Sequence, residues 1–270
     1  SNNCGVHKIK LSSSVYYIKN GINIPYGNLL FEGTESLIRE DKIPFGYNNV
    51  NGKLYSCIYS DDTDSVITCS KTVSQPIQFR DINFFNDYSK NKRFYTICFN
   101  FNAEYQGPTW PIYFEKCHFE GYHKAINIQS PVTYCIHKLY VRSCAFTICD
   151  WCVYFADVVD NTELKLRRNL TWEFDFSNNV CHFCANIYRG GNSYNICRIE
   201  QNNLEGTQNT YLDGNSCLND YQIDIECSQD TSVVIKYNHW EAVTHPLIAL
   251  RISNSASLEL DNNNYIGVSN

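Results

Sequence analysis

The chain has 270 residues, a formal net charge of −6 and 43% hydrophobic residues. An acidic balance argues against a nucleic acid partner, because phosphate binding selects a basic surface. No apolar run approaches the ~20 residues that a membrane-spanning helix needs, so we expect no membrane insertion. The chain contains no Met and no signal-like segment at its start, so we expect it to be a piece of a longer protein.

Residues 1–75 predict an N-terminal cap and short early strands. The segment Asn20–Gly33 (NGINIPYGNLLFEG) has short apolar runs separated by glycine turns. From residue 76 to residue 270 a repeat follows, and we expect both parts to form one continuous domain.

The repeat consists of two apolar residues five positions apart, and its copies begin roughly 25 to 35 residues from one another, a spacing typical of stacked supersecondary units. The pairs are Phe79/Phe84, Phe114/Phe119, Val141/Phe146, Phe176/Cys181, Ile199/Leu204, Ile235/Trp240 and Leu260/Tyr265. We number positions from the first residue of each pair, so that the second residue is position +5.

The positions around each pair predict a strand, a sharp corner and a second strand. Position −2 is apolar in all seven copies, which gives strand alternation with position 0, and position +2 is mostly polar. Position +3 is Asn179, Asn202, Asn238 and Asn263 in the last four copies. Asn tolerates a left-handed backbone and can bond to the same residue one rung away. Strands and corners at fixed offsets, without helical stretches, predict an all-β parallel β-helix.

Position +1 is expected to face solvent and carries charges of alternating sign. Opposite charges would lie above one another in neighbouring rungs, on both sides of Ser177, which supports this register. The variable copy length predicts loops at about residues 88–93, 103–110, 157–163 and 209–220, and such loops commonly build the binding face of a solenoid.

Fourteen cysteines are present, and two CxxC motifs begin at Cys149 and Cys181. That pairing is typical of a zinc site. The register favours a different interpretation, because Cys149 and Cys184 share position +8, Cys117 and Cys144 share position +3, and Cys181 fills the inward position +5. We expect a buried, reduced cysteine ladder, with zinc and disulfides as the alternatives.

The Ile-x-Phe-x-Asp/Asn-x-x-Phe repeat with its Asn corner resembles the right-handed, pectate-lyase-like parallel β-helix superfamily. Asn20–Gly33 is similar to the opening rung of phage tailspike and pectate-lyase-type proteins, and the resemblance covers about residues 15–268. The catalytic phrases of polygalacturonases and pectate lyases are missing, apart from an early Asp61-Asp62. The resemblance therefore points to the viral branch, tailspikes and tail fibres.

This resemblance implies a homotrimer, located in the virion as a tail spike or fibre, that recognises bacterial surface polysaccharide. It leaves open whether the chain also cuts that polysaccharide as a depolymerase, by hydrolysis or by elimination. The alternatives are a non-catalytic structural or adhesive fibre segment, and a secreted bacterial polysaccharide lyase or glycoside hydrolase. The glycan and the host are not specified by the sequence.

The outward position +6 gives the first catalytic candidates, His182, Glu205 and Glu241 on three consecutive rungs. Two carboxylates one strand spacing apart can share a proton, which raises one pKa and provides a general acid. The alternative group lies on the largest loop and the following strand. It comprises Asp213, Asp220, Asp224 and Glu226.

Aromatic side chains outside the core columns are candidate sugar platforms, because flat rings stack on the apolar faces of sugars. The candidates are Trp110, Tyr113, Tyr122, Trp151 and Tyr154. The sequence predicts no metal site and no cofactor.

Overall fold

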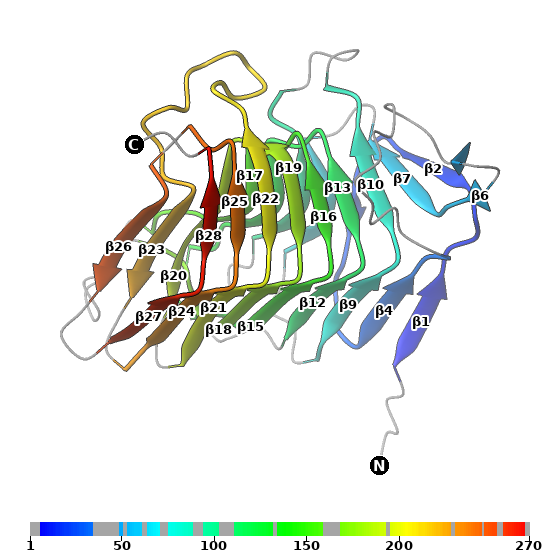
Figure 1. Cartoon of the computed structure of the whole chain (residues 1–270). Coiled ribbons are helices and arrows are strands. Elements are labelled where there is room, and N and C mark those ends of the chain that lie inside the picture. Colours follow the sequence, from blue (N-terminus) through cyan, green and yellow to red (C-terminus); the bar gives the residue numbers. More distant parts are fainter. Residues whose placement is uncertain are drawn as a thin grey trace.

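The chain folds into a right-handed parallel β-helix with three faces around one core, as seen in a computed structural model (Figure 1). The structure describes residues 6–34, 49–50, 53–60, 64–70, 75–88, 94–102, 111–131, 134–158, 168–192, 195–227, 230–244, 246–252 and 256–267. Within those ranges no helix has the length and apolar character needed to cross a bilayer. The predicted fold class is confirmed.

Each rung contributes one strand to each face, except that the last rung has no strand on the third face among the described residues. We number the faces in chain order. The first face is built by β1 (His7–Lys10), β4 (Leu29–Glu32), β9 (Ile77–Arg80), β12 (Ile112–Glu115), β15 (Tyr134–Arg142), β18 (Leu170–Ser177), β21 (Ile196–Glu200), β24 (Ser232–Lys236) and β27 (Ser257–Asp261). The second face is built by β2 (Val15–Ile18), β7 (Cys57–Ser60), β10 (Asn83–Asn86), β13 (His118–Glu120), β16 (Ala145–Thr147), β19 (Val180–Cys184), β22 (Asn203–Thr207), β25 (His239–Glu241) and β28 (Asn264–Ile266).

The third face lies behind the other two in Figure 1. It is built by β3 (Ile22–Asn23), β8 (Ser65–Cys69), β11 (Ile97–Phe101), β14 (Lys124–Ile128), β17 (Trp151–Phe155), β20 (Asn186–Asn192), β23 (Ile223–Cys227) and β26 (Ile248–Ile252). A small antiparallel hairpin, β5 (Asn49–Val50) with β6 (Lys53–Leu54), stands apart from these faces. The pairings β4–β9 and β7–β10 join the strands on the two sides of residue 75.

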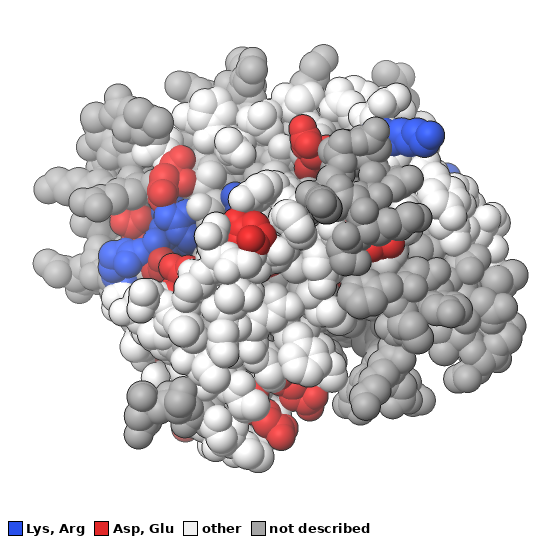
Figure 2. Space-filling view, turned by 90° about the horizontal axis from the view of Figure 1, so that it is seen from above, with Lys and Arg blue, Asp and Glu red and all other residues white. Residues whose placement is uncertain are grey.

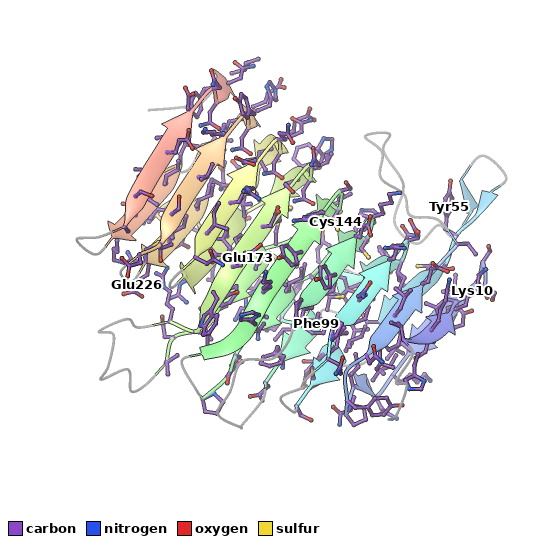
Figure 3. The ribbon with its side chains drawn as sticks, turned by 90° about the horizontal axis from the view of Figure 1, so that it is seen from below. Lys10, Tyr55, Phe99, Cys144, Glu173 and Glu226 are labelled. Atoms are coloured by element: carbon purple, nitrogen blue, oxygen red, sulfur yellow. The ribbon has the colours of Figure 1, made fainter. Side chains whose placement is uncertain are left out.

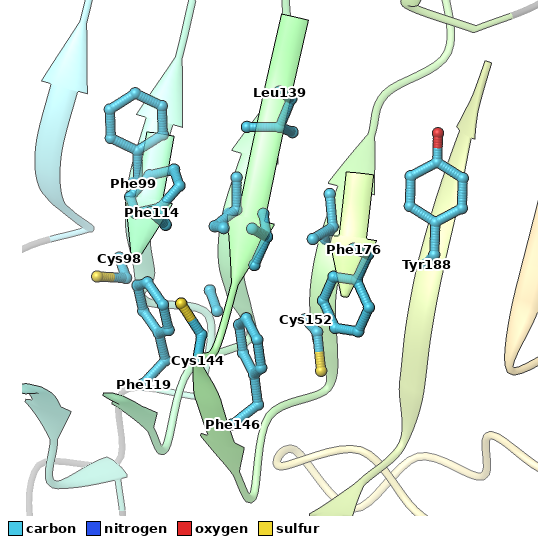
Figure 4. Close-up of a cluster of buried hydrophobic side chains, with 14 of the residues drawn as sticks. Cys98, Phe99, Phe114, Phe119, Leu139, Cys144, Phe146, Cys152, Phe176 and Tyr188 are labelled. Atoms are coloured by element: carbon cyan, nitrogen blue, oxygen red, sulfur yellow. The ribbon is translucent and has the colours of Figure 1, made fainter. Parts of the chain in front are cut away.

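The predicted register is the observed one. Position 0 pairs in sequence along the first face, as Phe79 with Phe114 and Phe114 with Val141. Position +5 does the same along the second face, as Phe84 with Phe119 and Phe119 with Phe146. Stacked rings follow, with centroids 5.0 Å apart for Phe79 and Phe114 and 5.2 Å apart for Phe84 and Phe119. The next pair along the second face, Phe119 and Phe146, has centroids 5.0 Å apart and is labelled in Figure 4.

The left-handed residue of the first corner is at position +2, not at the Asn of position +3. All seven +2 residues have a φ between 52° and 58°, and they are Asp81, Lys116, Ser143, Asn178, Gln201, Tyr237 and Asn262. A second left-handed corner follows at position +7 and is glycine at Gly121, Gly206 and Gly267. A left-handed backbone is least costly for glycine, which lacks a Cβ.

The Asn residues at position +3 form the predicted ladder between rungs. Nδ2 of Asn179 donates to Oδ1 of Asn202 at 3.1 Å, and Nδ2 of Asn202 donates to Oδ1 of Asn238 at 2.9 Å. Each of these three side chains is at most 2% exposed. Buried amides are stable there because every donor finds an acceptor one rung away.

The cysteines at the repeat positions lie in the core, as the ladder interpretation expects. Cys117, Cys144, Cys149, Cys181 and Cys184 are free thiols and at most 1% exposed. The sulfurs of Cys152 and Cys181 lie 3.8 Å apart, a contact rather than a bond. Among the described residues no three His, Cys, Asp or Glu side chains gather as metal ligands.

The outward charges of the first face pair between neighbouring rungs. Arg80 contacts Glu115 at 2.8 Å along position +1, as predicted. Arg142 instead contacts Asp175 of the next rung at 2.6 Å, at position −1. Glu173, labelled on this face in Figure 3, accepts the Tyr140 hydroxyl at 2.6 Å. The charges on this face are therefore mostly compensated within it.

Candidate functional site

A pocket of about 360 Å³ opens on the third face, beside the loop of residues 208–222 that joins β22 to β23. Its aromatic lining is Trp151, Tyr154, Tyr211 and Tyr221. Its titratable and charged lining is His123, Lys124, Arg189, Asp220 and Asp224. A concave site with rings and a few polar groups is the usual form of a small-molecule site.

The strand register places the pocket side chains on neighbouring rungs. Lys124 pairs with Trp151 between β14 and β17. Tyr154 of β17 pairs with Arg189 of β20, and Arg189 pairs with Asp224 of β23. Because paired strands lie about 4.8 Å apart and side chains alternate between the two sides of a sheet, these outward residues form a continuous surface.

Tyr154 lies between two cations. Nζ of Lys124 is 3.8 Å from the ring centroid, and Cζ of Arg189 is 4.9 Å from it. Arg189 also donates to the Tyr154 hydroxyl at 2.7 Å and to both carboxylate oxygens of Asp157 at 2.7 and 2.8 Å. Burial, and then the nearby Arg189, lower the pKa of Lys124 to about 8.

Asp224 is held by two arginines. Arg251 donates to Oδ1 of Asp224 at 2.6 Å, and the buried Arg168 donates to Oδ2 and, at 2.9 Å, to the backbone oxygen of Asp224. Figure 2, seen from above, shows a group of basic side chains at the left with acidic side chains beside it, and a separate basic group at the upper right. The Asp224 carboxylate is therefore compensated by the protein itself.

The loop of residues 208–222 is tied to the strands by a buried carboxylate. Oδ1 of Asp150, which is 1% exposed, accepts the amide of Leu212 at 2.8 Å. Oδ2 of the same group lies 2.7 Å from Nδ1 of His123. Burial raises the pKa of Asp150, and the hydrogen bond to His123 opposes that rise. An imidazole oriented by a carboxylate can take up or give a proton.

The loop of residues 208–222 forms one wall of the pocket and contributes the carboxylate of Asp220 and the exposed ring of Tyr221. The Tyr211 hydroxyl donates to the carboxylate of Asp220 and lies 3.2 Å from the side-chain amide of Asn186. Tyr221 is 40% exposed, whereas Trp151 is 7% exposed and meets Tyr154 edge to face at 5.3 Å. Tyr221 is therefore the accessible platform of the pocket.

The predicted stack of His182, Glu205 and Glu241 lies on the second face, away from this pocket, and its register is as expected. His182 contacts one oxygen of Glu205, and Asn203 donates to the other at 2.9 Å. These bonds, that of Asn203 first, lower the pKa of Glu205. Glu241 lies 3.2 Å from its own partner, His239. Each carboxylate has a separate histidine, which favours a charged Glu205 over a shared proton.

The remaining predicted residues are divided between several places. Asp220 and Asp224 line the pocket, whereas Asp213 accepts the Tyr95 hydroxyl at 2.7 Å and Glu226 is 7% exposed.

Of the predicted aromatic platforms, Trp151 and Tyr154 line the pocket, whereas Tyr122 and Tyr113 do not. Tyr122 is fully buried in the core, so it cannot stack on a sugar; Tyr113 stacks on Tyr140 at 4.9 Å on the first face; Trp110 lies outside the described residues.

Five pocket residues were not predicted as site residues: His123, Lys124, Arg189, Tyr211 and Tyr221. A signal existed for part of this group, because the register extends into the third face. Position +13 is Asn127, Tyr154 and Arg189 on consecutive rungs. Tyr211 and Tyr221 belong to an irregular loop, whose residues have no equivalent positions in the other copies of the repeat.

No family model matches the chain, and no curated protein sequence matches it significantly. The chain is thus placed by its architecture, as a parallel β-helix with a lined pocket on one face.

Proposed function

We propose that the chain recognises bacterial cell-surface polysaccharide through the pocket of the third face. The observation that carries this proposal is the combination of an exposed ring, Tyr221, with Asp220 and Lys124 in one concavity of about 360 Å³. Sugars present apolar ring faces for stacking and hydroxyls for hydrogen bonds to charged groups. A strand of the β-helix holds Lys124, and the bond from Leu212 to Asp150 ties the loop that carries Asp220 and Tyr221 to the strands, so less ordering energy is lost on binding.

The proposal also assigns the chain to a tail spike or fibre that assembles as a homotrimer. This part rests on the resemblance of the repeat and of Asn20–Gly33 to phage tailspikes. Light scattering measures the assembly, since three copies have three times the mass of a monomer. A monodisperse monomer at working concentration would contradict the trimer and favour a secreted protein.

The binding test uses two matched tyrosine variants. Tyr221→Ala removes the exposed ring of the pocket, and we expect binding to capsule or O-antigen polysaccharide to weaken by about tenfold. Tyr113→Ala removes a ring on the first face and serves as the control. If no bacterial polysaccharide binds the wild type, or if both variants bind equally well, recognition through this pocket is wrong.

Cleavage of the bound polysaccharide is a second candidate, favoured by His123 with Asp150 behind it. Such an imidazole can act as a general base. It can remove a proton from water in a hydrolysis, or a C–H proton from a sugar ring in an elimination. New reducing ends or unsaturated sugar absorbance would reveal the reaction, and we expect His123→Gln to abolish it. Loss in Glu205→Gln with full activity in His123→Gln would instead assign the chemistry to the second face.

A further inference from the structure

Most charges around the pocket are compensated by neighbours in the protein. Arg189 is paired with Asp157, and Asp224 is paired with Arg168 and Arg251. Asp220 accepts the hydroxyl of Tyr211. These groups can shape a binding site. Because their charges are already compensated within the protein, they do not favour an anionic or a cationic ligand.

Lys124 differs from them because, among the residues that the structure describes, no carboxylate forms an ion pair with its ammonium group. The side chain is half-buried and its Nζ lies 3.8 Å from the Tyr154 centroid, on a ring that also contacts Arg189. A cation–π contact partly replaces water around the ammonium group. Burial, and then repulsion from Arg189, lower the pKa of Lys124.

We propose that the sugar bound in this pocket carries a carboxylate, and that Lys124 is the residue that binds it. The inference rests on the proposed recognition of polysaccharide and names the chemical class of its ligand, an acidic sugar such as a uronic acid. A carboxylate beside Nζ supplies the counter-charge that this side of the pocket lacks and adds a charge-assisted hydrogen bond. Asp220, on the wall formed by the loop, is an acceptor suited to a sugar hydroxyl.

The experiment compares acidic oligosaccharides with their own neutral derivatives. The probes are a glucuronate-containing bacterial oligosaccharide, oligosialic acid, and each of these after chemical reduction of its carboxylates to alcohols. Binding is measured by calorimetry for the wild type, Lys124→Gln, Lys124→Arg and the control Lys116→Gln. Lys116 is an exposed lysine at a corner before the second face, so its charge is removed far from the pocket.

We expect at least one acidic probe to bind at least tenfold more tightly than its reduced form. Lys124→Gln should remove this preference, Lys124→Arg should retain most of it, and Lys116→Gln should leave it unchanged. If reduced and acidic probes bind equally, or if Lys124→Gln keeps the preference, the inference is overturned while polysaccharide recognition stands. If none of the probes binds and host polysaccharide does not bind either, both proposals fail.

Discussion

Nδ1 of His123 lies 2.7 Å from Oδ2 of Asp150, and Oδ1 of the same carboxylate accepts the amide of Leu212. One buried carboxylate thus connects a side chain that lines the pocket, His123, with the loop that contributes Tyr211, Asp220 and Tyr221 to the lining. The position of the wall therefore depends in part on a group that is not among the residues lining the pocket.

Asp150→Ala should therefore loosen the loop. The change leaves the Leu212 amide without its acceptor, and we expect a loss of about 1–3 kcal/mol in the free energy of unfolding. Hydrogen exchange at Leu212 should become faster in this variant. His123→Gln is the control, because it keeps the bond from Leu212 to Asp150. Unchanged exchange at Leu212 in Asp150→Ala would show that the loop is held by other contacts.

Removing one amide from the Asn ladder should destabilise the whole stack. Oδ1 of Asn202 accepts from the backbone and the side chain of Asn179, and Nδ2 of Asn202 donates to the Phe176 oxygen. Asn202→Ala leaves these buried groups unpaired, at a cost of about 3 kcal/mol. Urea unfolding measures the loss, with the exposed Asn264→Ala as the control. An equal effect of the two changes would contradict the structural role of the ladder.

Glu120 should make the protein less stable in neutral and alkaline solution. It is 6% exposed, and burial raises its pKa to about 7 from an ordinary value of 4.5. The folded state then holds a proton that the unfolded state has lost, so stability falls as the pH rises from 4.5 to 7. The loss is complete above pH 7 and amounts to about 3 kcal/mol at most.

Glu120→Gln removes this loss, so the variant should be more stable than the wild type at pH 8 and about equal to it at pH 4.5. His118, whose Nε2 lies 3.9 Å from Glu120, gives the opposite dependence. Burial lowers the pKa of His118 to about 4, so its contribution is lost as the pH falls from 6.5 to 4. Chemical unfolding at the two pH values checks the sign; a less stable variant at pH 8 refutes it.

The core thiols should resist alkylation until the protein unfolds. Burial raises the pKa of the thiols of Cys57 and Cys227 to about 12 and that of Cys117 above its ordinary range. Iodoacetamide attacks the thiolate, which is scarce at pH 8 in such sites. Mass spectrometry should show these cysteines unlabelled in the native protein and labelled in concentrated guanidinium chloride. Fast native labelling of Cys117 would contradict a closed core.

The sequence was sufficient for the scaffold because the scaffold is periodic. Phe79, Phe114 and Val141 occupy one column, and an error in one copy is corrected by the others. The corner was assigned one position too late, since Asn at position +3 suggested a left-handed residue where it actually makes the ladder. Asn can recur at a position because of the hydrogen bonds of its side chain as well as because it tolerates a left-handed backbone conformation.

The pocket was predicted only in part. Trp151 and Tyr154 were predicted as sugar platforms, and Asp220 and Asp224 as members of one acidic group. No feature of the sequence indicated that the two pairs meet. Trp151, Tyr154 and Asp224 meet through the strand register, whereas Asp220 reaches them through the path of residues 208–222, to which the bond from Leu212 to Asp150, 62 positions away in the chain, contributes. This contact occurs once and is not repeated from rung to rung, so it could not be predicted from the repeat pattern.

The pocket is lined partly by strands, which also build the core, and partly by one loop. The residues that stabilise the fold are therefore largely different from the loop residues that could determine which ligand is bound. Lys124, Tyr154 and Arg189 belong to rungs whose inward neighbours fix the core, whereas Tyr211, Asp220 and Tyr221 belong to a single loop. In the proposed site, exchanging the exposed part of that segment is expected to alter ligand preference, provided that the buried Cys217 and Gln222 and the bond from Leu212 to Asp150 are kept. If the proposed recognition is correct, the strands are the constant part of the site and the loop of residues 208–222 is the part whose exchange changes specificity.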